Sequence, residues 1–69
     1  MNYVAIIEEG PTSFGAYVPD LPGCVAVGET REETEALIKE AIELHLEDLA
    51  SKHQSTPAPT STALLVSVG

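Results

Sequence analysis

The sequence has a single cysteine, no tryptophan and only three basic side chains among its 69 residues. The lone cysteine, Cys24, excludes a disulfide within the chain. Together with His45 and His53 it gives no spacing typical of a structural zinc site. A single core in so short a chain supplies only about 3–5 kcal/mol of net stability. Because a disulfide and a metal are not available as supports, size alone favours self-association.

Basic residues are scarce while acidic residues are abundant. Eleven Asp and Glu stand against Arg31, Lys39 and Lys52, which gives a net charge of −8. Direct binding to nucleic acid requires clustered Lys and Arg that displace phosphate counterions, and the sequence has no such cluster. The acidic excess predicts a surface that attracts basic proteins, or one that merely keeps a small protein in solution.

Long apolar runs are also missing. The N-terminus, MNYVAIIEEG, lacks the basic start and the length of a signal peptide. No run approaches the roughly 20 apolar residues that a membrane-spanning helix needs, and an unpaired cysteine fits a reducing compartment. We therefore expect a cytoplasmic protein with no membrane partner.

Short apolar segments predict strands at both ends of the chain. Residues 2–9, 13–18 and 24–29 are rich in β-branched or aromatic side chains and are separated by short turn segments, which favours an antiparallel meander. Residues 51–62 contain two prolines and many hydroxyls and predict a mobile loop. Residues 63–68, ALLVSV, predict a closing strand that runs parallel to the first strand, because a helix supplies the crossover.

That helix is the clearest predicted element. Thr30 and Glu33 have the spacing of a capping box, which places the helix start at Thr30. Apolar side chains then recur at three- and four-residue steps and give one apolar stripe, made by Leu37, Ile38, Ala41, Ile42, His45 and Leu49. The predicted order is β-β-β-α-β, an α+β fold in one domain, 1–69, with one helix on one face of a four-stranded sheet.

The connection VPDLPGC, residues 18–24, combines stiff and flexible residues. Pro19 and Pro22 fix the backbone and remove amide donors. Asp20 can accept hydrogen bonds from nearby amides, and Gly23 permits a positive φ. We interpret the segment as a rigid turn that directs the chain into the third strand, formed by Pro19, Asp20, Leu21, Pro22, Gly23 and Cys24.

The stretch YVPDLPGCVAVGETREETEALIKEAIELHLEDL, residues 17–49, resembles the N-terminal domain of HicB-type antitoxins, and the resemblance extends from Tyr3 to about Leu49. The resemblance implies a partial RNase H-like fold with a mixed four-stranded sheet in the spatial order 3-2-1-4. It also implies a partner, a small basic RNA-cleaving toxin of the HicA type. Complete antitoxins of this kind continue into a helix-turn-helix or ribbon-helix-helix segment that binds DNA. This chain ends at Gly69, so we expect a solitary form without direct DNA binding.

The fold implied by the resemblance raises the possibility of nuclease chemistry, which the sequence does not favour. RNase H catalysis needs several carboxylates that converge on two metal ions, and the interior of the first predicted strand is Val4-Ala5-Ile6-Ile7. Cys24 has no basic neighbour in sequence that would lower its pKa. His45 lies on the apolar stripe without a recognisable nucleophile. We expect no catalytic residue, no metal and no cofactor.

Two functions then remain ahead of an enzyme with unrecognised chemistry. The first is an antitoxin module that neutralises a HicA-type toxin, with candidate toxin contacts at Tyr17, Asp20, Glu43 and Glu47. The second is a solitary oligomeric interaction protein with an unrelated partner. A HicA-type reading frame beside the gene would separate them. In both cases we expect a homodimer or higher oligomer, because the predicted sheet has two uncharged edges, with candidate contacts at Val25, Val27, Leu65 and Val66.

Overall fold

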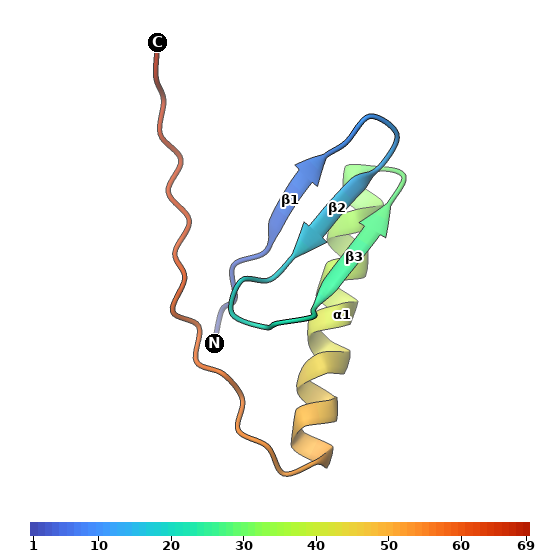
Figure 1. The fold of residues 1–69 in the computed structure, drawn as a ribbon, viewed down its shortest axis with the longest axis vertical. Coiled ribbons are helices and arrows are strands. Elements are labelled where there is room, and N and C mark those ends of the chain that lie inside the picture. Colours follow the sequence, from blue (N-terminus) through green and yellow to red (C-terminus); the bar gives the residue numbers. More distant parts are fainter.

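The computed structural model describes residues 1–69 and contains three strands followed by one helix (Figure 1). The elements are β1 (Ile6–Glu9), β2 (Phe14–Tyr17), β3 (Val25–Gly28) and α1 (Arg31–Ser51). The predicted α+β class and the antiparallel meander are confirmed. Each strand is shorter than the apolar segment that predicted it, because pairing stops where the turn residues begin.

The strand β2 lies in the middle of the sheet, between β1 and β3. Ile7, Ala16 and Ala26 stand opposite one another across the three strands. Their side chains point towards α1, because α1 packs on the face that buries Ala16. Side chains alternate along a strand, so Tyr17 and Val25 project from the opposite face, which no element covers.

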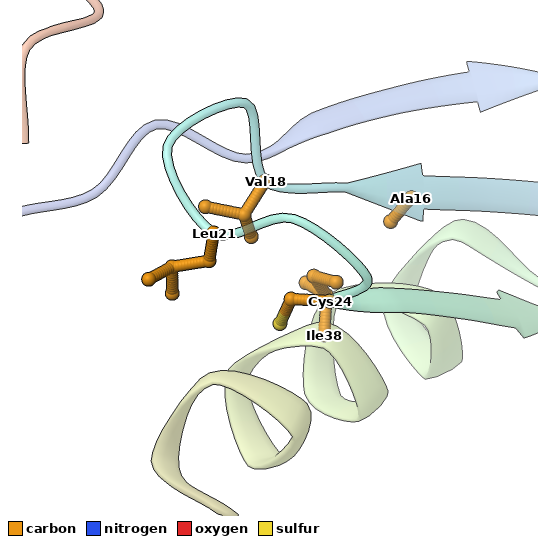
Figure 2. Close-up of a cluster of buried hydrophobic side chains, with 5 residues drawn as sticks. All are labelled: Ala16, Val18, Leu21, Cys24 and Ile38. Carbon is orange, nitrogen blue, oxygen red and sulfur yellow. The ribbon is translucent and has the colours of Figure 1, made fainter. Parts of the chain in front are cut away.

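A small core fills the space between the sheet, the turn and α1 (Figure 2). It consists of five buried side chains: Ala16, Val18, Leu21, Cys24 and Ile38. Leu21 comes from the turn and is fully buried, so the turn contributes to the core as well as reversing the chain. The sequence pattern pointed to the stiffness of this turn but not to its apolar contribution.

The start of α1 is held by a set of hydrogen bonds around Thr30. The Glu33 amide donates to the Thr30 hydroxyl at 3.1 Å, and the Glu33 carboxylate accepts from the Glu29 amide at 3.1 Å. The buried Thr34 hydroxyl donates to the Thr30 carbonyl at 2.8 Å. A Cβ on Gly28 would lie 2.5 Å from the Thr34 hydroxyl oxygen. The end of β3 therefore approaches α1 as closely as a glycine allows.

The predicted closing strand at residues 63–68 is absent from the structure, and this corrects the four-stranded sheet expected from the sequence. Residues 54–69 form no helix or strand and pair with none. In Figure 1 this part of the chain passes on the β1 side of the sheet and diverges from it. A strand exists only beside an edge that accepts its hydrogen bonds, and the diverging chain has none. We call residues 62–69 the C-terminal arm.

Candidate functional site

The turn between β2 and β3 is closed by three backbone hydrogen bonds. The amides of Leu21 and Cys24 donate to the carbonyls of Val18 and Leu21 at 3.1 Å, and the Val18 amide donates to the Cys24 carbonyl at 3.2 Å. Gly23 has a φ of 84°, a conformation that side chains with a Cβ rarely adopt. This geometry leaves the Asp20 carboxylate free to face a distant part of the chain.

Asp20 binds the chain just before the C-terminal arm. The amides of Thr60 and Ser61 both donate to Asp20 Oδ2 at 3.0 Å, and their hydroxyls both donate to Asp20 Oδ1 at 3.0 Å. The hydrogen bond from the Ser61 amide, helped by the other three donors, lowers the pKa of the Asp20 carboxyl. We call this arrangement the Asp20 clamp. A hydrogen bond from the Tyr3 hydroxyl to the Pro57 carbonyl holds the same stretch a few residues earlier.

The clamp was missed in the sequence because its members are forty residues apart. Thr60 and Ser61 lie in a segment whose composition predicted only a mobile loop. A hydroxyl-rich segment carries no local signal for its partner, since Ser and Thr hydroxyls bond to many groups. The carboxylate in the VPDLPGC turn could have suggested an anchor, but not the residues that it holds.

The Cys24 thiol is buried in the core. Burial raises its pKa, because the thiolate would lose its hydration there. A raised pKa disfavours nucleophilic chemistry. No group of three or more His, Cys, Asp or Glu side chains lies close enough together to hold a metal ion. The Cys24 side chain is thus one of the packed residues of the core.

The outward side of α1 is acidic. Seven Asp and Glu lie on α1 against Arg31 and Lys39. Arg31 pairs with Glu35 and Lys52 pairs with Asp48, each at 3.0 Å and largely exposed, so both pairs contribute little to stability. Glu43 and Glu47 are exposed one turn apart and make no ion pair within 4.0 Å. They form a negative surface without an ion pair on the outer side of the helix.

An apolar groove lies between β3 and α1. Three of its lining side chains, Leu37, Ala41 and Leu44, come from α1, and β3 contributes the rest apart from Glu40. Leu44 is 56% exposed, and β3 is an edge strand with no neighbour on this side. An exposed apolar groove beside a free strand edge is a surface that a partner can cover.

A second hollow lies beside the N-terminus and is more polar. It is lined by Met1, Asn2, Tyr3, Lys39, Ile42, Glu43 and Leu46. Tyr3, Ile42 and Leu46 also pack against the core. Lys39 and Glu43 are the two charged residues of its lining.

The structure separates the four residues predicted to contact a toxin. Tyr17 projects from the uncovered sheet face and is 42% exposed, while Glu43 and Glu47 lie on α1. Both carboxylate oxygens of Asp20 are engaged in the clamp. The four do not form one surface, and only the glutamates lie side by side. Their role as contacts stays a prediction.

The four residues predicted as oligomer contacts are all accessible. Val25 and Val27 are 62% and 67% exposed on β3, and Leu65 and Val66 are 98% and 68% exposed on the C-terminal arm. No other part of the chain covers them. Both pairs are thus free to meet a second molecule.

Comparison with known proteins identifies the class to which this fold and turn belong. A family described as the HicB-like antitoxin of the bacterial toxin–antitoxin system matches residues 3–68. The chain belongs to this HicB-like antitoxin family, as its turn and helix motifs predicted.

Relatives of similar length come from distant organisms. A UPF0150 protein of Helicobacter pylori is 44% identical over 66 residues, covering 86% of this chain and 92% of the relative. A UPF0150 protein of Synechocystis is 42% identical over 57 residues, covering 81% and 72%. A UPF0150 protein of Thermoplasma acidophilum is 33% identical over 67 residues, covering 96% and 97%. No solved structure matches this chain.

The helix α1 is the only helix of the chain, and it carries too many charged residues to cross a membrane. The apolar side of α1 packs against the core and borders the two hollows described above.

Proposed function

We propose that this chain is an antitoxin module that binds and neutralises a small, basic, RNA-cleaving toxin of the HicA type by direct protein–protein contact. Membership of the HicB-like antitoxin family supports a toxin–antitoxin role. The net charge of −8 supports a basic partner in particular. The family membership also favours a non-enzymatic role, and the buried Cys24 thiol fits it.

The observation that carries this proposal is the acidic outer side of α1. Glu43 and Glu47 have no cationic partner, so a toxin lysine or arginine could approach them without displacing an existing ion pair. Complementary charge accelerates association and selects against partners of the wrong sign. We place the centre of the toxin contact on these two glutamates. Tyr17 and Asp20 belong to other surfaces and would be reached only by a partner that extends around the sheet edge.

RNA protection tests the proposal directly. The toxin to use is the product of a HicA-type reading frame beside the gene, and the readout is RNA cleavage as this chain is titrated in. The wild-type chain should abolish cleavage. The double substitution Glu43→Lys and Glu47→Lys should raise the concentration needed by about tenfold or more, equivalent to about 1.4 kcal/mol.

A matched control is available at the other end of the molecule. Glu8→Lys with Glu9→Lys changes the net charge by the same amount, but these residues end β1, on the hairpin side of the sheet. The control should neutralise the toxin nearly as well as the wild type. Cleavage that continues at saturating wild-type chain contradicts the proposal for that toxin. Equal losses in both variants would show that net charge acts without a specific contact on α1.

The alternative is a solitary oligomeric protein with an unrelated partner. The exposed apolar side chains of the C-terminal arm favour self-association under either alternative. The absence of a HicA-type reading frame beside the gene would favour this alternative.

A further inference from the structure

We propose that the C-terminal arm of each chain docks on β3 of a second copy, where its apolar side chains fill the groove between β3 and α1. The inference assigns surfaces to the self-association proposed above and does not depend on the identity of any toxin.

The arm is an apolar segment with nothing to cover it. Leu64, Leu65 and Val68 are 82%, 98% and 91% exposed. Between Thr62 and Gly69 the arm has no charged side chain, although the chain as a whole carries a charge of −8. It is thus the part of the molecule that a second acidic copy can approach with the least electrostatic repulsion.

The receiving surface is the outer edge of β3. Its neighbouring groove is lined by Leu37, Ala41 and Leu44 from α1, and Glu40 is the only charged residue in the lining. The strand itself, VAVG, has neither a charge nor a proline that would discourage pairing. The opposite edge, β1, ends in Glu8 and Glu9 and is less suited to an added strand.

The chain's own arm is directed away from this groove. The Asp20 clamp fixes Thr60 and Ser61, and the Tyr3 hydroxyl binds Pro57. Figure 1 shows that the arm then continues along the β1 side, with β2 between it and β3. The groove of a second copy is free of this constraint.

The exposed area of a single chain matches what a dimer would bury. The chain exposes 5252 Å² for a mass of 7.3 kDa. Folded monomers of this mass expose about 4,200 Å², so the excess is about 1,100 Å². A stable interface of standard size buries about 800 Å² on each partner. Docking the arm and filling the groove would remove an excess of this size.

Side chains alternate between the two faces of an extended arm, and this alternation predicts which of them enter the groove. In an extended strand, Leu64, Val66 and Val68 share one face. The other face carries Ala63, Leu65 and Ser67 and would lie beside Val25 and Val27 on the uncovered sheet face. The set Leu64, Val66 and Val68 is wholly apolar and therefore suits the groove. Two copies that exchange arms in this way form a closed two-fold dimer, because each supplies one arm and one groove.

A pair of charge substitutions tests this alternation. Val66→Asp buries a carboxylate in the groove twice per dimer, so the dimer dissociation constant should rise by about 100-fold or more. Ser67→Asp places the same charge on the same arm but facing outwards, and should change the constant only a few-fold. Light scattering after gel filtration gives the mass, which for the wild type should be twice 7.3 kDa. Circular dichroism confirms that α1 is intact in both variants.

Cross-linking tests which edge receives the arm. A chain with Leu65→Cys, mixed with a chain carrying Val27→Cys, should form a disulfide-linked heterodimer under mild oxidation. Ile6→Cys is the matched control, since it lies in β1 and projects from the same sheet face as Val25. A wild-type monomer at micromolar concentration overturns the proposal. Equal dimerisation of Val66→Asp and wild type, or a cross-link to position 6 in place of 27, also overturns it.

Discussion

At the scale of single residues, Asp20 has the most far-reaching effect. Its carboxylate is the only group whose hydrogen bonds join the turn before β3 to the segment after α1. Four donors converge on it, and each oxygen accepts from two. Such an arrangement favours the ionised form, because hydrogen bonds to a charged carboxylate are stronger than those to a neutral carboxyl.

Asp20→Ala should release the segment that Asp20 holds. Alanine has no side-chain acceptor for the Thr60 and Ser61 amides. Hydrogen exchange at these two amides should then approach the rate of an unstructured chain. Asp48→Ala is the control, because it removes a similar exposed carboxylate whose partner is Lys52. Unchanged protection at both amides in Asp20→Ala would contradict the clamp.

Lowering the pH should also release the segment that Asp20 holds, because the pKa of this carboxyl is lowered in the folded chain. The stability that ionised Asp20 contributes is therefore complete above the ordinary carboxyl pKa. It is lost as the pH falls through the lowered folded-state pKa. Protection of the Thr60 and Ser61 amides should therefore decrease on acidification in the wild type. In Asp20→Ala, exchange at these amides should not depend on pH beyond the intrinsic exchange rate.

At the scale of elements, α1 depends on its first turn. Thr30→Ala removes the hydroxyl that accepts from the Glu33 amide and should lower the free energy of unfolding by about 1 kcal/mol. Urea denaturation followed by circular dichroism measures the loss. Thr12→Ala is the control, because Thr12 is exposed in the β1–β2 connection and its hydroxyl makes no hydrogen bond within the chain. Equal stability of Thr30→Ala and wild type would contradict the capping role.

The elements also show what local sequence can specify. The β-branched runs around Ile6 and Val25 and the capping box at Thr30 carry their own signals, and the structure forms the corresponding strands and helix. The ALLVSV segment has equally strong strand preference but no strand in a single chain, because pairing depends on an available edge and on the direction of approach. Local preference cannot encode either of these. The clamp was unpredictable for a similar reason, since its members are 40 and 41 residues apart in the sequence and meet only in the folded chain.

At the scale of the whole molecule, the two proposed interactions should respond to salt in opposite directions. Two copies that each carry a charge of −8 repel one another, so screening should strengthen a dimer held by apolar contacts. A complex with a basic toxin is held partly by attraction and should weaken. We expect the two dissociation constants to move in opposite directions between about 0.05 and 0.5 M NaCl.

Analytical ultracentrifugation of the chain alone, and titration calorimetry with the toxin, provide these constants. The variant Glu43→Lys with Glu47→Lys should reduce the salt dependence of toxin binding while leaving dimerisation intact. A dimer that dissociates in salt would show that charge, rather than the apolar arm, holds the copies together.

The Asp20 clamp also determines where the chain can tolerate a change in length. Between the end of α1 at Ser51 and Pro57, whose carbonyl binds the Tyr3 hydroxyl, an inserted or deleted residue can be absorbed, because both ends of the stretch are fixed independently. Beyond Ser61 the tolerance ends. One extra residue there would move Leu64, Val66 and Val68 to the opposite face of an extended arm. Length variation among relatives should therefore fall before the clamp and not after it.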